Sequence, residues 1–384
     1  MPADTFLSTR NPELKLRQKV WQLNWGLVLL LCLVTAFGIA MLYSAANGSM
    51  EPWASRQLMR FGIGLVVMFA AALIDIRFWF RYAYLIYFGC LLLLGAVEVM
   101  GDIGMGAQRW IDIGFVRLQP SEMMKVALIL ALARYFHGVS MEEIGRPLFL
   151  LLPLGMVLAP AALVMKQPDL GTAGMLLLAA GALFFCAGVR WWKFALVIVA
   201  GLATVPVAWQ FLHEYQKARV MTFLNPENDP LGAGYHSLQA MIAFGSGAIT
   251  GKGFMQGTQS HLNFLPEKQT DFIFTMLAEE FGLVGSLALL GLYFLLLCYG
   301  FAIAFRVRNQ FARLLAIGLT TNLFLYVFIN MAMVMGIFPV VGVPLPLVSY
   351  GGTVLLTVMA AMGLIMSCYI HRDTRISRRG TAEV

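Results

Sequence analysis

The feature that most constrains this chain is a series of apolar runs, most of them about as long as a membrane-spanning helix. Hydrophobic residues make up 60% of the 384 residues, and charged residues only 12%, against about 25% in a typical soluble domain. A bilayer core needs about 20 apolar residues per helix. The sequence therefore predicts an all-α integral membrane protein with ten transmembrane helices. The predicted spans are 25–43, 61–74, 82–97, 121–133, 147–165, 170–189, 194–212, 281–305, 314–335 and 354–370.

The organisation around these runs is simple. Residues 1–24 are polar and basic and precede an apolar run long enough to span, so they predict a cytoplasmic arm rather than a cleaved signal peptide. Residues 25–371 form one membrane domain, and residues 372–384 a cytoplasmic tail. The five cysteines each stand alone in an apolar run, which predicts buried packing without disulfides or metal-type spacing.

The basic residues predict the orientation. Of the 27 Lys and Arg residues, 17 lie in the arm, the tail and the alternate loops on the same side as the termini. The positive-inside rule then places both termini in the cytoplasm and one large loop, about 213–280, outside. The net charge of +7 is explained by this topology, so nucleic-acid binding is not expected.

The large outer loop is the predicted functional region. It carries seven of the 20 acidic residues, and loops longer than about 12–15 residues are uncommon unless they are functional. Within it, residues 245–254 are dense in glycine around Lys252, a composition that suits phosphate cradling but is weak evidence alone.

Asp271 lies at the end of this loop, at the predicted N-terminus of a helix for which Thr270 is a candidate cap. A helix from 271 to 305 would be about 52 Å long, too long for the bilayer, so residues 271–280 should lie at the outer interface. The helix dipole would keep the Asp271 carboxylate ionised and ready to accept a proton. Capping alone is the competing interpretation.

Three other outer segments carry unusual residues. In 104–125, Pro120 suits the first turn of a helix, and Lys125 lies one turn inside a span, as either a functional group or a snorkelling lysine. In 166–172, Asp169 is a candidate helix cap. Residues 336–352 contain three prolines and no charge, which indicates a re-entrant or lipid-contacting loop.

Together these segments resemble the SEDS family (shape, elongation, division and sporulation). The stretch LPEKQTDFIF is more similar to elongation-type members than to septal ones. The resemblance covers about residues 100–355 in the family's order. Its pieces are AQRWIDIG, QPSEMMK, KQPDLGT, RVMTFLNPENDPLGAGYHSLQ, GSGAITGKGF, GTQS, LPEKQTDFIF, AEEFG and GVPLPLVSYGG.

The resemblance implies a peptidoglycan glycosyltransferase that polymerises lipid II at the outer face of the bacterial cytoplasmic (inner) membrane during cell elongation. The family's essential aspartate corresponds to Asp271, to which we assign the role of general base in an inverting transfer. Candidate groups for the leaving pyrophosphate are Arg109, Lys125, Arg219 and Lys252; the expected supporting residues are Glu122, Asp169, Glu280 and Ser349.

A divalent metal, Mg²⁺ or Mn²⁺, is compatible with this chemistry, but no cluster of oxygen ligands identifies its position. The implied substrates are lipid II and a glycan on undecaprenyl pyrophosphate. The implied partners are a class B penicillin-binding protein and the rod-complex proteins MreC and MreD. The alternatives are a lipid II flippase, a scaffold without catalysis, and a septal glycosyltransferase.

Overall fold

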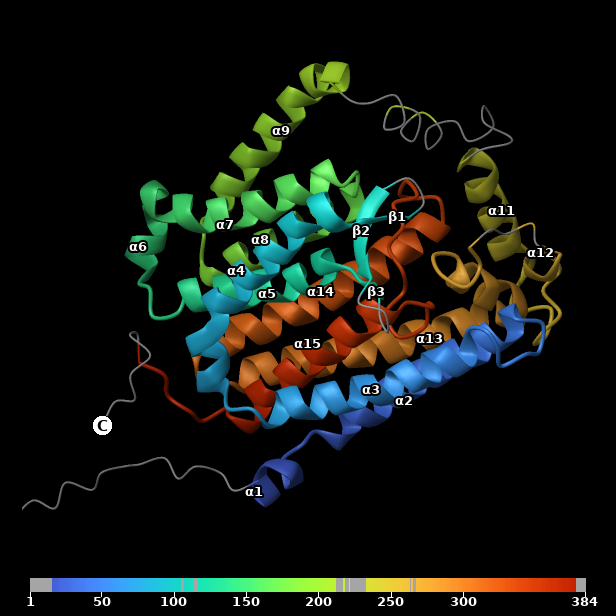
Figure 1. The fold of residues 1–384 in the computed structure, drawn as a ribbon, viewed down its shortest axis with the longest axis horizontal. Helices are drawn as coiled ribbons and strands as arrows, with labels where there is room; N and C mark the ends of the chain where they lie inside the picture. Colours follow the sequence, from blue (N-terminus) through green and yellow to red (C-terminus); the bar gives the residue numbers. More distant parts are fainter. Residues whose placement is uncertain are drawn as a thin grey trace, which may run out of the picture.

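The computed structural model describes residues 16–104, 107–112, 117–211, 217, 221, 233–262, 264 and 267–377. Within these residues the fold is a bundle of antiparallel helices with one small sheet (Figure 1). The elements are α1 Leu16–Trp21, α2 Trp25–Ala45, α3 Ala54–Leu73, α4 Ile76–Met100, β1 Asp102–Gly104, β2 Ala107–Asp112, β3 Arg117–Leu118, α5 Pro120–Tyr135, α6 Met141–Gly145, α7 Pro147–Lys166, α8 Leu170–Ala187, α9 Trp191–Phe211, α11 Ala233–Ser246, α12 Thr258–His261, α13 Ile273–Arg306, α14 Gln310–Val334 and α15 Gly352–Ile370.

The predicted helical membrane fold is confirmed. Eight helices of the described chain are long and apolar enough to cross a membrane: α2, α3, α4, α7, α8, α13, α14 and α15. The two remaining predicted spans fall on α9, whose apolar part is shorter, and on the 16-residue helix α5. The predicted second span, 61–74, was too short at its start. Helix α3 begins seven residues earlier and includes Arg56 and Arg60.

The helix ends meet at two opposite ends of the bundle. At one end, called the basic end here, Lys19 donates to the carbonyl of Leu73 and Ser367 to that of Ile74. At the opposite end, called the site end here, the last turn of α2 meets the first part of α13, and Ser44 donates to Glu280. The chain therefore enters α2 and leaves α15 at the same end.

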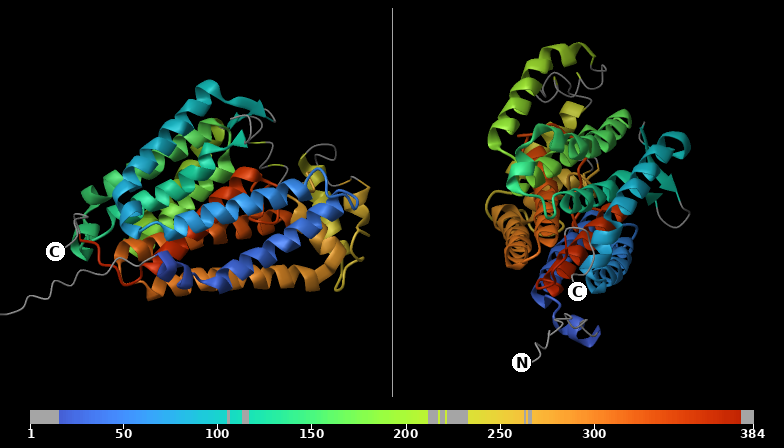
Figure 2. Two further views of the ribbon diagram at one scale, coloured as in Figure 1. Left: turned by 60° about the horizontal axis from the view of Figure 1, so that its bottom comes forward. Right: turned by 90° about the vertical axis from the view of Figure 1, so that its left-hand side faces the viewer.

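Helices α14 and α15 form the centre of the bundle. In their apolar segments 83% and 78% of residues are buried, against 28–44% in the other six long helices. Glycines allow α15 to approach α3 closely, because a Cβ on Gly363 would lie 2.4 Å from the carbonyl oxygen of Met68. Such small-residue contacts are common between membrane helices. Helix α9, in contrast, leans away from the bundle (Figures 1 and 2).

The segment between α14 and α15 folds back into the bundle. Leu345, Leu347 and Val348 are buried, and a Cβ on Gly38, in the middle of α2, would lie 2.6 Å from the Cα of Val348. Tyr293 on α13 donates to the carbonyl of Pro346. The segment thus returns into the helix bundle, as expected of a re-entrant loop, while Ile337 and Phe338 at its start stay exposed.

Helix α13 is interrupted at Gly282, whose φ of 63° and ψ of −156° are not helical. The interruption lies next to Phe281, where the bilayer-spanning part was predicted to begin. At the interruption, backbone carbonyls of α13 lack partners within the helix, and amides of the glycine-rich segment donate to them. The Lys252 and Gly253 amides donate to the carbonyls of Glu279 and Glu280 at 3.0 Å.

The same pairing explains the glycines of this segment. A Cβ on Gly251 would lie 2.1 Å from the carbonyl oxygen of Glu280, and a Cβ on Gly247 would lie 1.9 Å from that of Ala278. The amides of Gly251, Lys252 and Gly253 donate to backbone carbonyls, so the structure favours a packing role for this segment over a phosphate cradle.

Three features were not predicted. Strands β1, β2 and β3 form a three-stranded sheet in that order at the site end, and α11 and α12 lie in the large loop. The cysteines form no disulfide, but only Cys90 and Cys368 are buried, while Cys186 and Cys298 are exposed. Exposure on a membrane-facing helix costs a cysteine little, so the expectation of five buried cysteines is wrong.

Candidate functional site

Asp271 lies just before α13 in a segment fixed by the re-entrant loop. Ser349 Oγ donates to the carbonyl of Thr270 at 2.6 Å, and the Tyr350 amide donates to the carbonyl of Gln269 at 2.8 Å. On α14, Asn330 Nδ2 donates to the carbonyl of Asp271 at 3.0 Å. The backbone that carries the carboxylate is therefore held from two sides, and Ser349 has a supporting position.

The electrostatic account of Asp271 needs correction. The N-cap of α13 is Phe272, and no side chain caps the helix, so neither Thr270 nor Asp271 has the expected capping role. Burial, together with the nearby carboxylates of Glu267 and Asp169, raises the pKa of the Asp271 carboxyl to about 6. The site thus favours the protonated form more than water does, in contrast to the predicted stabilisation of the carboxylate.

A glycine lies beside the carboxylate. Gly342 in the re-entrant loop adopts a φ of 71°, and a Cβ there would lie 3.5 Å from Asp271 Oδ2. A glycine at this position therefore keeps the side of the carboxylate free of a side chain.

Arg109 and Asp169 meet at the turn between α7 and α8. Arg109, on β2, donates to the carbonyls of Gln167 at 3.0 Å and Pro168 at 2.5 Å, and its Nη1 lies 3.8 Å from Asp169 Oδ2. Asp169 also caps α8 by accepting from the Thr172 amide at 3.1 Å, as predicted. The Arg109 side chain stays 27% exposed, so part of it is accessible to a ligand.

Glu122 and Lys125 form an enclosed ion pair one turn inside α5. Lys125 Nζ lies 2.8 Å from Glu122 Oε1, and the two side chains are only 1% and 4% exposed. Tyr326 on α14 donates to Glu122, and the Lys125 ammonium lies 4.2 Å from the centre of its ring. Lys125 therefore does not snorkel.

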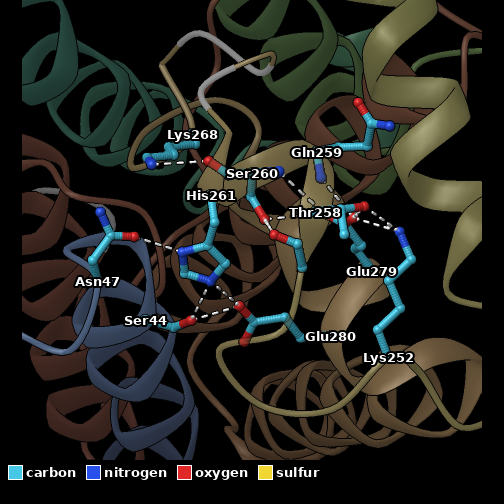
Figure 3. A network of polar contacts seen from close by, with 11 residues as sticks. Ser44, Asn47, Lys252, Thr258, Gln259, Ser260, His261, Lys268, Glu279 and Glu280 are labelled. Carbon is cyan, nitrogen blue, oxygen red and sulfur yellow. Dashed lines mark hydrogen bonds and ion pairs between the residues drawn. The ribbon is translucent and has the colours of Figure 1, made fainter.

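Lys252 belongs to a second polar cluster, shown in Figure 3. Its ammonium lies 2.7 Å from Glu279 Oε1 and 2.8 Å from Thr258 Oγ1. The fully buried Glu279 also accepts from the amides of Gln259 and Ser260. Lys252 thus balances the charge of a carboxylate that organises α12.

Glu280 follows Glu279 in the sequence, but its side chain points away from Lys252 and connects α12 to α2 (Figure 3). Its Oε1 accepts from Ser44 Oγ at 2.5 Å and lies 3.1 Å from His261 Nε2. His261 Nδ1 lies 2.6 Å from Asn47 Oδ1. The structure thus places Glu280 in a structural connection rather than beside Asp271.

The other expectations can be placed briefly. Arg219 lies outside the described residues. Among the residues that are described, no three of the His, Cys, Asp and Glu side chains converge as ligands of a metal ion would.

Sequence reasoning missed the residues that hold the site together. Gln57 donates to the carbonyl of Ser349 at 3.0 Å from α3. Asn330, Tyr326 and His261 likewise act through partners far away in the sequence. The only available signal was a polar residue inside an apolar helix, as for Gln57 and Asn330.

The fold and site define a class: a polytopic membrane protein with a partly buried carboxylate and an arginine gathered at one end of its helices. A family model described as FTSW_RODA_SPOVE, cell cycle protein, matches residues 22–374. The chain therefore belongs to the FtsW, RodA and SpoVE family, which is the SEDS family of the resemblance.

Individual relatives agree with this assignment. The chain is 44% identical over 372 residues to the peptidoglycan glycosyltransferase MrdB of Escherichia coli (strain K12), covering 95% of this chain and 98% of that protein. A solved structure described as a peptidoglycan synthase complex that coordinates polymerisation and crosslinking contains a chain with TM-score 0.80 and 35% identity, covering 91% and 98%. The rod shape determining protein RodA of Thermus thermophilus matches with TM-score 0.69 and 30% identity, covering 92% and 98%.

Proposed function

We propose that this chain is a peptidoglycan glycosyltransferase that polymerises lipid II, with Asp271 as its general base. The activity is the one in the name of the 44% identical relative, and it agrees with the expectation from the sequence. The observation that carries the assignment of the base is the position of Asp271: a partly buried carboxyl, held from two sides by its backbone, with a glycine beside it.

The chemistry needs such a group. The acceptor is the 4-hydroxyl of the GlcNAc in lipid II, a poor nucleophile until its proton is removed. A base works best when its pKa lies near the working pH, and it can contribute about 10²–10⁴-fold to the rate. A carboxyl whose pKa is raised to about 6 is still mostly ionised at neutral pH, and it is a stronger base than an exposed aspartate.

The transfer inverts the donor sugar in one displacement. The acceptor oxygen forms a bond to C1 of the donor, its proton passes to Asp271, and the bond between C1 and the undecaprenyl pyrophosphate breaks. The electron pair of that bond leaves with the pyrophosphate, whose growing negative charge calls for a cation already in position.

Arg109 is the predicted cation that best suits this role, because its guanidinium is partly exposed and held by the turn before α8. We revise the proposed roles of Lys125 and Lys252. Lys125 is enclosed with Glu122, and Lys252 is bound to Glu279, so we assign both to holding neighbouring elements in place. Arg219 stays a candidate cation.

We further propose that the site end faces the periplasm and that the two termini lie in the cytoplasm of a bacterium. The excess of Lys and Arg at the basic end supports this orientation. A substrate with a polyprenyl tail stays in the bilayer, since each buried CH₂ contributes about 0.8 kcal/mol, so a site at a membrane surface suits it. A role in elongation, with a class B penicillin-binding protein, MreC and MreD, is in keeping with the rod-shape RodA relative.

The main alternative is a lipid II transporter, which would place charged groups near the bilayer midplane. In the described helices, Glu122 and Lys125 lie in the first turns of α5, and Glu279 and Glu280 precede the break in α13. The charges thus gather near one end, which favours catalysis there.

The deciding experiment uses the purified chain in vesicles with labelled lipid II and its penicillin-binding partner. We expect glycan strands that lengthen with time. Movement of lipid II across the bilayer without any glycan product would contradict the proposed function.

A further inference from the structure

The proposed reaction brings two lipid-linked diphosphates together, one on the donor and one on the acceptor. Arg109 supplies a cation at the turn before α8. A second cationic position exists at the N-terminus of α15, on a side chain that sequence analysis did not single out. This inference rests on the proposed function and concerns how its substrates are held.

Arg60, on α3, is the side chain at this position. Its guanidinium lies 4.6 Å from the centre of the Tyr350 ring. Its Nη1 atom is buried and has no hydrogen-bond partner among the described residues, and no carboxylate of those residues pairs with it. A buried cationic nitrogen without a partner carries a substantial desolvation cost, so such groups normally have a counter-ion.

The N-terminus of α15 faces the same guanidinium. Its N-cap is Gly351, and no side chain caps it, so the amides of its first turn lack acceptors within the helix. A Cβ on Gly352 would lie 3.2 Å from Arg60 Nε and 3.3 Å from Cζ. The positive end of a helix therefore lies against a cation, a repulsive arrangement that an anion bound to both would stabilise.

The chemistry and the depth of this position define the anion. A guanidinium and a helix N-terminus both bind phosphate oxygens, the first through two parallel N–H groups. Gly351 and Gly352 are only partly buried, so a ligand can approach their amides. Arg60 lies six residues into α3, about 9 Å along the helix, which is close to the depth of lipid headgroups rather than the aqueous phase.

The position is also connected to Asp271. Tyr350, which stacks on Arg60, donates its amide to Gln269, and Gln57, one turn before Arg60, donates to the carbonyl of Ser349. A phosphate at Arg60 would therefore be held by the same loop that fixes the segment of the general base.

We propose that Arg60 and the N-terminus of α15 form a binding site for the diphosphate of a polyprenyl-linked substrate. The membrane's own phospholipids carry the same phosphate chemistry, and the experiment below separates the two sources.

The test measures the affinity of the full-length chain for fluorescent lipid II in phosphatidylcholine nanodiscs. All variants carry Asp271→Asn so that the probe is not consumed. We expect Arg60→Gln to weaken binding about 10- to 100-fold, the usual effect of losing a charge-assisted contact. Gly352→Ala should weaken it in the same direction, because its methyl group intrudes on the guanidinium. Alanine favours a helix more than glycine does, so that loss cannot be attributed to unfolding.

The matched control is Arg56→Gln, which removes the same charge from an exposed position on the same helix. It should bind the probe like the parent. Unchanged binding in both Arg60→Gln and Gly352→Ala would overturn the proposal, and so would an equal loss in Arg56→Gln, because net charge would then be the cause. Full displacement of the probe by phosphatidylglycerol nanodiscs would assign the site to bulk lipid and also overturn it.

The two proposals can fail separately. A chain that binds lipid II through Arg60 but never forms glycan would contradict the proposed function and leave this site standing. A chain that polymerises lipid II while Arg60→Gln changes neither affinity nor rate would contradict this site alone.

Discussion

Replacing Gly282 by alanine tests the account of the break in α13. Its φ of 63° and ψ of −156° lie in a region almost restricted to glycine, and a side chain there costs about 1–3 kcal/mol. The new Cβ would also lie 2.4 Å from the amide nitrogen of Gly251 and 2.6 Å from the carbonyl oxygen of Ile249. Both are backbone atoms, so no side-chain rotation relieves the contact.

The segment must then move, and four backbone hydrogen bonds across the break are lost or weakened. Two join Lys252 and Gly253 to the carbonyls of α13, and two join the amides of Leu283 and Val284 to residues 248 and 249. Each contributes about 1 kcal/mol net. With the strain, we expect Gly282→Ala to destabilise the folded chain by about 3–6 kcal/mol.

The assay is unfolding of the purified chain in detergent, together with hydrogen exchange of the amides in residues 248–253. Gly291→Ala is the matched control, because it lies on the same helix and its Cβ would meet nothing within 4 Å. The control should be unchanged or slightly more stable. Equal stability of the two variants, with equal protection of the 248–253 amides, would refute this account of the break.

Four further predictions concern the charged groups. Polymerisation should fall as the pH drops through about 6, because Asp271 is then protonated, and a rate that stays constant down to pH 4.5 would contradict the role of the base. The raised pKa also means that stability falls as the pH rises from about 4 to about 6, so Asp271→Asn should stabilise the chain at neutral pH by up to about 3 kcal/mol in thermal unfolding. Glu279→Gln should destabilise by about 2–4 kcal/mol, because an NH₂ donor replaces one of the two oxygens that together accept five hydrogen bonds, whereas exposed Glu142→Gln should not. Lys125→Met should cost about 3–5 kcal/mol by leaving Glu122 unpaired, and the double variant with Glu122→Gln should cost less in the same unfolding assay.

The helices were largely predictable because apolar length is a local property of the sequence. The start of α5 at Pro120 and the cap of α8 at Asp169 were predictable for the same reason. The start of α3 was not, because Arg56 and Arg60 interrupt the apolar pattern while their helix continues to the end of the bundle.

The position of Asp271 at the head of α13 was predictable, but its electrostatic environment was not. The dipole argument used one helix, whereas burial and the carboxylates of Asp169 and Glu267 come from the tertiary fold. The hydrogen-bond partners of the buried acids could not be predicted either, because they are distant in the sequence. Tyr326 lies 204 residues from Glu122, and Ser44 lies 236 residues from Glu280.

The glycine-rich segment shows a different limit of sequence reasoning. Glycines beside a lysine suit a phosphate and suit close backbone packing equally well. The choice between these roles depended on the break at Gly282, which places the carbonyls of Glu279 and Glu280 against the segment.

The central claim is that the Asp271 carboxylate removes the proton from the acceptor sugar. The most direct measurement compares wild type, Asp271→Asn and Asp271→Glu in single-turnover polymerisation of lipid II, with lipid II affinity determined for each. The account predicts that Asp271→Asn binds lipid II as wild type does but forms glycan at least about 100-fold more slowly, and that Asp271→Glu recovers part of the rate. Glycan formation by Asp271→Asn at the wild-type rate would contradict it.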